Sequence, residues 1–285
     1  MLVSEIINIG SNKLKDKNIN SHLLDSELLL SKVLQLSREK ILTNYNNFVK
    51  KDDINKFNIL LKRRLKYEPM AYIFQKKEFF SKDFLVNNST LIPRPETELL
   101  IEKIIENYKK KDIYILDIGT GSGCIILTLL NEMKKSKGIG IDISKKALDV
   151  AKMNARILKI NKRLKFYKRS FNQIFGHKFD LIVSNPPYIC TYDIKNLSND
   201  IKNYEPRIAL NGGNDGLDVI KKIIYKSTNI LKRKGILALE IGYGQYRKIS
   251  QILKLHGFKD KFLVKDYQNN IRCILATLEN WFDKN

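Results

Sequence analysis

The spacing of apolar residues predicts helices in the first part of this 285-residue chain. Apolar side chains recur at helical spacing over Leu23–Leu34 and again over Asp53–Tyr67. Pro69 is expected to end the second helix, because a proline ring clashes with the preceding helical turn. Residues 1–75 show neither a glycine-rich loop nor a candidate nucleophile, so we expect a small helical bundle with a binding role rather than a chemical one.

A β-hairpin and a proline-rich turn are expected after this helical region. Glu78–Val86 carries two short aromatic runs around Ser81–Asp83, a pattern typical of two strands joined by a turn. Leu91–Glu98 contains two prolines and leads into a helix with an acidic first turn, where the helix dipole favours negative charge. The expected organisation is a helical domain over 1–75, a β-hairpin linker over 76–92 and a second domain over 93–285.

From residue 113 onward the pattern alternates between short apolar runs and amphipathic segments. Strands are expected over 113–117, 138–142, 180–184, 235–241 and 271–278. Helices are expected over 125–130 and 217–231, with a third that ends near residue 158. This alternation predicts an α/β fold of the Rossmann-like kind, a mostly parallel sheet with helices on both faces.

The overall composition is that of a folded globular protein, with 43% hydrophobic and 29% charged residues. The sequence contains no apolar run close to the roughly 18 residues of a membrane span. Its N-terminus lacks the basic, apolar and small-residue regions of a signal peptide. We therefore expect a cytoplasmic protein without a membrane partner.

The cysteines and histidines give no sign of a disulfide framework or a metal site. The cysteines are odd in number and far apart: Cys124, Cys190 and Cys273. The histidines lack the spacing of metal ligands: His22, His177 and His256. A reducing compartment and a metal-free site are the expectation.

The net charge of +22 and the pI of about 9.7 would suit an anionic partner such as RNA. Lysine, however, far outnumbers arginine and is spread along the chain, whereas proteins that read bases rely on arginine. Compositional drift is therefore the favoured explanation, with a weak electrostatic association with RNA or the ribosome superimposed on it.

A glycine-rich loop, Asp117–Gly123, follows the first predicted strand and opens a helix. Alternate glycines let a backbone turn sharply and approach a ligand closely. The loop departs from the nicotinamide pattern GxGxxG, because Cys124 stands where the third glycine belongs, and the GKS or GKT of a phosphate-binding loop is missing. Asp142 ends the next predicted strand, and its two carboxylate oxygens can accept both hydroxyls of a ribose. The candidate cofactor residues are Gly119, Thr120, Gly121, Ser122, Gly123 and Asp142.

The segment Ser184–Tyr188 follows a buried strand and holds the most informative motif. Ligands in open α/β sheets lie beyond the carboxyl ends of the strands, so this segment should face the cofactor. The Asn185 side-chain oxygen and the Pro186 carbonyl can accept both N–H bonds of a planar NH2 group, and Tyr188 offers an aromatic face to stack on it. An amide or exocyclic amino nitrogen is the expected acceptor, bound by Asn185, Pro186, Pro187 and Tyr188.

Both motifs resemble those of class I SAM-dependent methyltransferases. The loop Asp117–Gly123 is similar to the first motif of that class. The Asn-Pro-Pro-Tyr segment is similar to a signature of methyltransferases that act on adenine N6 or on a glutamine amide. The chemistry of the motif leaves both substrates open.

Further segments resemble the bacterial release factor glutamine methyltransferase family over nearly the whole chain: Asp25–Leu30, Glu68–Pro69, Leu91–Glu98, Tyr204–Asp218 and Lys265–Arg272. The resemblance implies N5-methylation of the glutamine in the Gly-Gly-Gln loop of class-1 peptide chain release factors, with S-adenosyl-L-methionine (SAM) as cofactor. It implies a class I methyltransferase fold preceded by a helical bundle and a β-hairpin. It also carries SAM binding onto Gly119–Gly123, Asp142 and Asn185, and glutamine binding onto Asn185–Tyr188.

One segment departs from the family pattern. The family usually has an Asp beside an aromatic residue close to the adenine, whereas Arg169–Phe171 occupies that place here. The acid is missing and the aromatic residue is displaced by one position. Ser170 and Phe171 are therefore the candidate adenine neighbours, and we expect somewhat weaker SAM binding than the family pattern would give.

Two other functions stay open from the sequence. An adenine-N6 methyltransferase acting on RNA or DNA would suit the positive charge, although the chain has no evident target-recognition domain. A SAM-binding protein without catalysis would need a broken acceptor motif, and Asn185–Tyr188 is intact. Arg94 and Glu98 are either charges at a capped helix start or residues that shape the mouth of the cofactor site.

Overall fold

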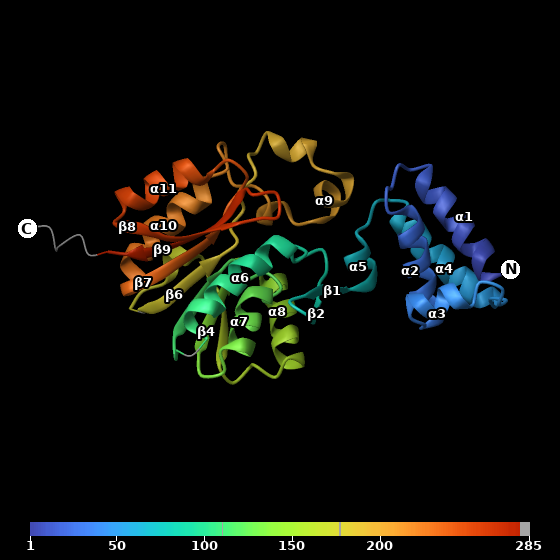
Figure 1. Ribbon diagram of the computed structural model, residues 1–285, viewed down its shortest axis with the longest axis horizontal. Helices are drawn as coiled ribbons and strands as arrows, with labels where there is room; N and C mark the ends of the chain where they lie inside the picture. Colours follow the sequence, from blue (N-terminus) through green and yellow to red (C-terminus); the bar gives the residue numbers. More distant parts are fainter. Residues whose placement is uncertain (110, 177, 280–285) are drawn as a thin grey trace, which may run out of the picture. The chain divides into compact units, whose positions relative to one another are not determined.

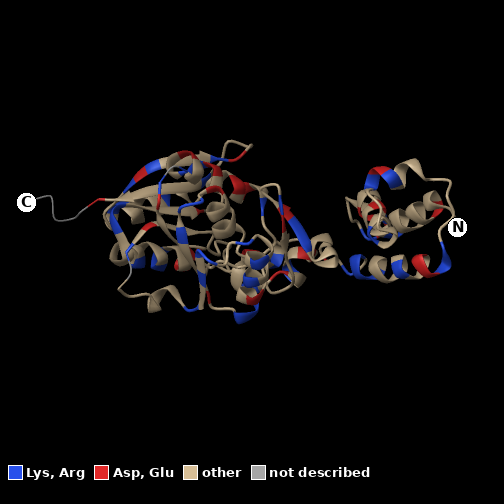
Figure 2. Ribbon diagram, turned by 90° about the horizontal axis from the view of Figure 1, so that it is seen from below, with Lys and Arg blue, Asp and Glu red and all other residues tan. Residues whose placement is uncertain are grey.

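The computed structural model describes residues 1–109, 111–176 and 178–279, which form two compact units (Figure 1). Met1–Gln75 and Ser198–Tyr204 make the first unit, and Lys76–Leu197 with the chain from Glu205 onward makes the second. Charged residues are distributed over both units (Figure 2). Within the described residues, no helix is long and apolar enough to cross a membrane.

The first unit is a bundle of helices. They are α1 (Val3–Lys15), α2 (His22–Leu34), α3 (Arg38–Thr43), α4 (Lys51–Arg64), α5 (Met70–Phe74) and α9 (Asn199–Tyr204). Apolar residues three or four positions apart turn one face of each long helix inward. The shared core includes the fully buried side chains of Ile6, Leu14, Leu29, Phe57 and Leu61.

The end of α4 differs from the prediction. The helix closes at Arg64 and not at Pro69, because the chain turns into a left-handed backbone at Tyr67, where φ is 67°. Pro69 instead caps the start of α5, a position that suits its fixed φ and missing N–H. The helix predicted over Asp53–Tyr67 therefore ends three residues earlier than expected, and Pro69 is not the residue that ends it.

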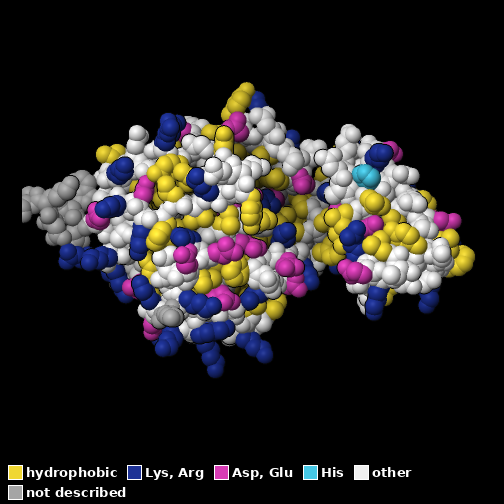
Figure 3. Space-filling view, viewed as in Figure 1, with side chains coloured by type: hydrophobic (Ala, Val, Ile, Leu, Met, Phe, Trp, Pro, Cys, Tyr) yellow, Lys and Arg dark blue, Asp and Glu magenta, His cyan; other side chains and the backbone are white. Residues whose placement is uncertain are grey.

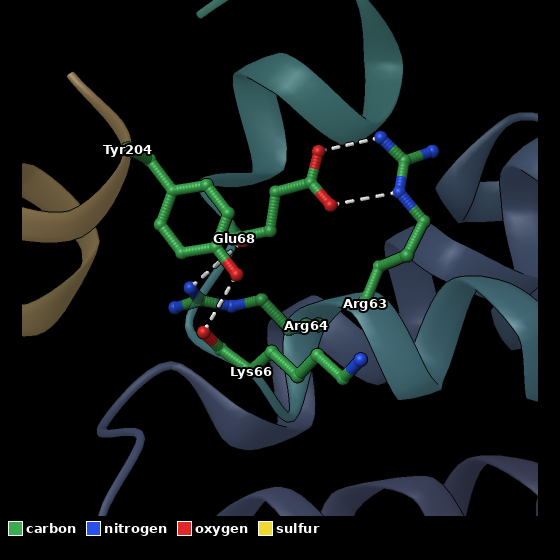
Figure 4. A network of polar contacts seen from close by, with 5 residues as sticks. All are labelled: Arg63, Arg64, Lys66, Glu68 and Tyr204. Carbon is green, nitrogen blue, oxygen red and sulfur yellow. Dashed lines mark hydrogen bonds and ion pairs between the residues drawn. The ribbon is translucent and has the colours of Figure 1, made fainter. Parts of the chain in front are cut away.

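A polar network attaches α9 to the rest of the first unit (Figure 4). The Tyr204 hydroxyl donates a hydrogen bond to the Lys66 carbonyl at 2.8 Å. The Arg64 guanidinium donates to the Glu68 carbonyl, and Arg63 forms a two-pronged ion pair with the Glu68 carboxylate. The turn after α4 is thus held from both sides, and a short segment distant in sequence becomes part of the helical unit.

The predicted hairpin is present, with strands β1 (Lys76–Phe79) and β2 (Lys82–Leu85), and it belongs to the second unit. Its turn is Phe80–Ser81 and not Ser81–Asp83. Both turn residues have positive φ, 51° and 55°, as a two-residue turn matched to the strand twist requires. The Glu98 carboxylate accepts a hydrogen bond from the Phe80 N–H and holds this turn.

The second unit is built on a seven-stranded sheet in the order β5-β4-β3-β6-β7-β9-β8. The strands are β3 (Tyr114–Ile118), β4 (Lys137–Asp142), β5 (Leu164–Lys168), β6 (Phe179–Ser184), β7 (Leu231–Glu240), β8 (Phe258–Lys265) and β9 (Ile271–Leu278). The first five in the spatial order are parallel, and β9 runs antiparallel to both of its neighbours.

Helices cover both faces of this sheet (Figure 1). One face carries α6 (Pro95–Tyr108), α7 (Cys124–Glu132) and α8 (Lys145–Ile157), and the other carries α10 (Asp218–Ile230) and α11 (Tyr246–Leu255). Successive strand residues point to opposite faces of the sheet and pack into the hydrophobic core on each side. In β6, Leu181 packs on the first face and Ile182 on the second. The predicted fold class, a mostly parallel sheet with helices on both faces after a helical N-terminal part, is confirmed.

Candidate cofactor and acceptor site

A cavity of about 590 Å³ opens beyond the carboxyl ends of β3, β4 and β6, within the second unit. Its volume lies in the range of about 300–1,000 Å³ that is usual for small-molecule sites. The glycine-rich loop after β3, the end of β4 and the Asn-Pro-Pro segment after β6 all contribute to its wall. The predicted cofactor and acceptor residues line this cavity, with two exceptions, Gly123 and Tyr188.

The glycine-rich loop exposes bare backbone to the cavity. Gly119 and Gly121 have positive φ, 72° and 55°, which side-chain-bearing residues rarely adopt. A Cβ at Gly119 would meet no described atom within 4 Å, so the space beside it is open for a ligand. Gly123 instead permits close packing of α7 on α8, because a Cβ there would stand 2.9 Å from the Leu127 side chain and 3.3 Å from that of Ala151.

Two acidic side chains, Asp117 and Asp142, accept hydrogen bonds from the glycine-rich loop. Asp117 is fully buried, accepts a hydrogen bond from the Thr120 hydroxyl at 2.7 Å, and has its pKa raised to about 7 by burial. Asp142 lines the cavity and accepts from the Gly121 and Ser144 N–H groups at 3.0 and 2.8 Å. Burial also raises the pKa of Asp142. A carboxylate offers several lone pairs, so Asp142 can still accept from a ligand hydroxyl.

The segment that departs from the family pattern also lines the cavity. Ser170 caps a short 3₁₀ turn, its hydroxyl accepting from the Asn172 N–H. Phe171 begins this turn and packs partly against the core on the α10 side. Arg169 lies with its guanidinium 5.3 Å from the ring of Tyr167. An aromatic wall is therefore present where the adenine was expected, without the usual acid.

The acceptor segment follows β6, with Asn185, Pro186 and Pro187 in the cavity wall. The Asn185 amide group donates a hydrogen bond to the Thr97 hydroxyl at 3.2 Å. The Tyr188 ring packs against the buried core and the hydroxyl donates to the Glu240 carboxylate at 3.3 Å. Burial raises the pKa of Tyr188 to about 12. In this structure the aromatic face expected to stack on the acceptor is turned into the fold.

Three residues next to the acceptor segment were missed by the sequence-based reasoning. Thr97, at the start of α6, lines the cavity and donates to Glu240 at 2.5 Å. Glu240 is wholly buried at the end of β7. Arg272, on β9, donates to the Tyr188 hydroxyl at 3.3 Å. The available signal was Glu240 itself, since an acid within the apolar run GILALEI needs a buried partner.

The two charged residues after the hairpin hold different segments in place. Arg94 lines the cavity and forms an ion pair with the buried Glu205 at 2.5 Å. Glu205 also accepts a hydrogen bond from the Ile92 N–H, which ties the proline-rich segment to the cavity rim. Glu98 faces the hairpin turn instead. The described residues contain no group of three or more acidic, histidine or cysteine side chains that could hold a metal, and His177 lies outside the described residues.

The comparisons with known proteins match both units. Residues 5–74 match the family described as PrmC N-terminal domain, and residues 109–266 match a methyltransferase domain. A methyltransferase structure from Pyrococcus furiosus shares the fold, with 16% identity, a TM-score of 0.54, and coverage of 77% of this chain and 99% of that one. Fold and cavity together define a class I SAM-dependent methyltransferase.

Curated relatives narrow the family. The release factor glutamine methyltransferase of Clostridium acetobutylicum is 38% identical, over 92% of this chain and 94% of that protein. The bifunctional methyltransferase of Rickettsia conorii is 35% identical over 96% of this chain, which spans only 57% of that longer protein. The chain belongs to the release factor glutamine methyltransferase family.

The cavity fits the cofactor of this class. When bound, SAM supplies a methyl group activated by a sulfonium. The open backbone at Gly119 and Gly121 leaves room for its amino-acid end, Asp142 offers carboxylate oxygens to ribose hydroxyls, and Phe171 offers an apolar wall to a base. The individual roles of these residues stay predictions.

Proposed function

We propose that this protein transfers the methyl group of SAM to the side-chain amide nitrogen of the glutamine in the Gly-Gly-Gln loop of class-1 peptide chain release factors. The observation that carries the proposal is the position of Asn185–Pro187, in the same cavity wall as the glycine-rich loop. The name and coverage of the relatives, such as the Clostridium protein, support the substrate. Translation termination, and hence the cytoplasm, is the expected setting.

The chemistry follows from the acceptor nitrogen. A glutamine amide is planar and its lone pair is delocalised, so it must be oriented before it can attack. The Asn185 side-chain oxygen and the Pro186 carbonyl accept its two N–H bonds, which fixes the direction of the lone pair and favours the positive charge that develops on nitrogen. A proton leaves after transfer, when the nitrogen has become acidic, so the site needs no tuned general base at the start.

The helical first unit is the proposed binding site for the release factor. Its surface presents several large apolar side chains: Leu23, Leu24, Phe48 and Ile59. Exposed apolar side chains mark a protein-binding surface where they form a contiguous patch. The first unit offers no cofactor-like glycine loop, so a docking role is the simplest one for it.

The direct test is mass spectrometry of a purified release factor incubated with this protein and SAM. We expect a single added methyl group on the glutamine of the Gly-Gly-Gln loop. Asn185→Ala should abolish the transfer, whereas Asn107→Ala, a substitution on the outer part of α6, should not. Transfer to RNA or DNA with none to the factor would instead establish the adenine-N6 alternative.

We further propose a weak association with RNA through one basic face. Its exposed lysines are Lys109, Lys111, Lys134, Lys135, Lys137, Lys159, Lys162 and Lys165. Three loops and the first residues of β4 and β5 carry them, and backbone bonds from Lys137 to Ile113 and from Gly138 to Arg163 hold these segments side by side. They lie at the amino ends of β3, β4 and β5, at the end of the sheet opposite the cavity. Figure 3 shows lysines and arginines gathered there, below α7 and α8.

This association is tested by the salt dependence of binding to duplex RNA. Each phosphate contact contributes about 0.7–0.9 to the slope of log K against log salt concentration. Replacing Lys134, Lys135, Lys162 and Lys165 by Gln should lower that slope by about 3. The matched control replaces four exposed lysines of the first unit: Lys13, Lys15, Lys17 and Lys50. An equal loss in both variants would mean that net charge, and no particular face, attracts RNA.

A further inference from the structure

We propose that Glu240 is a positioning residue that acts through Thr97 to hold the Asn185 amide with its oxygen toward the acceptor nitrogen. This inference rests on the proposed glutamine methylation, and it adds the interaction that determines whether the Asn185 oxygen or nitrogen faces the acceptor. Nothing in the sequence motif supplies that device, because Asn185 can rotate its amide by half a turn and present nitrogen instead of oxygen.

The buried side chain of Glu240 links the two ends of the acceptor segment. Glu240 has no exposed surface, and its two oxygens take different hydroxyl donors. One oxygen accepts from Thr97 at 2.5 Å, and the other accepts from Tyr188 at 3.3 Å. In its ionised form the carboxyl group can only accept, so both hydroxyl protons are then committed to Glu240. The side chain thereby contacts one end of the acceptor segment directly and the other through Thr97.

The Thr97 hydroxyl sets which atom of the Asn185 amide group can face it. A threonine hydroxyl has a single proton, and this one is donated to Glu240. Toward Asn185 the Thr97 oxygen can therefore only accept. The Asn185 NH2 group takes that place at 3.2 Å. With its nitrogen fixed, the Asn185 oxygen faces away from Thr97 and serves as an acceptor at the cavity wall. An amide N–H is what such an acceptor recruits, and a carboxylate or carbonyl oxygen is repelled.

Arg272 orients the hydrogen bond between Tyr188 and Glu240, at the other end of the acceptor segment. Its Nη2 donates to the Tyr188 hydroxyl oxygen at 3.3 Å, which leaves the Tyr188 proton for Glu240. Burial raises the pKa of Glu240, whereas the Thr97 hydroxyl, the Arg272 charge and the Tyr188 hydroxyl lower it. The Arg272 charge thus favours the ionised form of a carboxyl group that has no access to water, against the opposing effect of burial. In its charged form Glu240 keeps every bond of the network pointing one way.

A pair of variants at Thr97 tests the relay. Thr97→Val keeps the shape of the side chain and removes the hydroxyl, whereas Thr97→Ser keeps the hydroxyl. We expect Thr97→Val to lower kcat for release factor methylation by about tenfold or more, which is a barrier change of about 1.4 kcal/mol per tenfold. The dissociation constant for SAM should stay within about twofold. Thr97→Ser should retain most of the activity.

Acceptor discrimination provides a readout that a merely structural role would not move. The full-length enzyme is titrated with the release factor, and with a factor carrying Glu in place of the loop glutamine. Wild type and Thr97→Ser should bind the glutamine form more tightly. Thr97→Val should reduce the ratio between the affinities for the glutamine and the glutamate form, because an Asn185 side chain that is no longer held by Thr97 can turn its NH2 group toward a carboxylate. Differential scanning calorimetry verifies that each variant is folded.

The outcomes separate the two claims. If the wild-type protein does not methylate the factor, the proposed function fails, and this inference fails with it. If wild type methylates the factor while Thr97→Val and Thr97→Ser match each other in kcat and in the binding ratio, the relay alone is wrong. A fall in kcat and a narrowed ratio in Thr97→Val only, with serine rescuing both, is the result we expect.

Discussion

The side chain of Asn154 on α8 joins the hairpin to the glycine-rich loop, and its removal should loosen both. Its carbonyl oxygen accepts from the Leu85 N–H at 2.8 Å, and its amide group donates to the Leu85 carbonyl at 3.0 Å. The same amide group donates to the Ser122 carbonyl at 2.9 Å. Asn154 is only 1% exposed, so water cannot replace these bonds. The change Asn154→Ala would leave three backbone groups unpaired.

The expected cost follows from these three bonds. Each contributes about 0.5–1.5 kcal/mol net, so their loss destabilises by about 1.5–4.5 kcal/mol. Alanine regains roughly 0.5 kcal/mol through its better helix propensity. The net loss is about 2.5 kcal/mol. For a domain of this size each kcal/mol moves Tm by about 2–4 °C, which predicts a fall of roughly 5–10 °C in the transition of the second unit.

Differential scanning calorimetry measures this fall, and titration calorimetry measures SAM binding. The SAM dissociation constant should rise, because Ser122 belongs to the cofactor loop. Asn107→Ala is the matched control, since that side chain bonds only to the Lys103 carbonyl of its own helix among the bonds described. It should shift Tm by no more than about 2 °C. A Tm for Asn154→Ala as high as that of the control would refute the bridging role.

Three further outcomes follow from the cofactor loop. Gly123→Ala should destabilise by about 1–2 kcal/mol, because φ is 81° and the new Cβ would meet the Leu127 side chain at 2.9 Å; an unchanged calorimetric Tm would contradict this. Asp117 has a pKa raised by burial to about 7, against 3.8 for the ordinary group, so the folded state holds a proton that the unfolded state has lost. Stability should therefore fall as pH rises from about 4 to about 7, and Tm measured across that window should fall less for Asp117→Asn. Asp142→Asn should weaken SAM binding about 10- to 100-fold by titration calorimetry, since a charged hydrogen bond contributes about 1.5–3 kcal/mol, and equal affinity would remove Asp142 from the ribose site.

Local patterns in the sequence were sufficient to predict the class of fold and to single out the candidate cofactor and acceptor motifs. The strands β3, β4, β6 and β7 are short apolar runs bounded by turns, and such runs depend on residues next to each other in the chain. The conformation of the glycine-rich loop is equally local, because only glycine adopts its positive φ without strain. Parallel strands place their carboxyl ends together, so the closeness of Gly119–Ser122 to Asn185 could be expected as well.

Other elements became visible only through pairing and packing. The strand β5 has a single buried residue, Leu164, and its identity comes from the hydrogen bonds with β4. The helix α9 joins the first unit through Tyr204, although the chain around it belongs to the second. The hairpin turn lies at Phe80–Ser81 and not at the predicted Ser81–Asp83. The register of the two strands, which is set by cross-strand pairs, decides which two residues take positive φ.

Neighbouring residues encode the glycine-rich loop and the Asn-Pro-Pro-Tyr motif, and local patterns of the same kind were sufficient to predict the fold class. The way in which Asn185–Tyr188 is held depends instead on contacts between distant parts of the chain. Thr97 lies 143 residues from Glu240 and 88 residues from Asn185, and Tyr188 turns its ring into the core to reach the same carboxylate. Hydrogen bonds between residues so far apart depend on the packing of α6 against β7. No local pattern records that packing, because the chain must close before those groups meet.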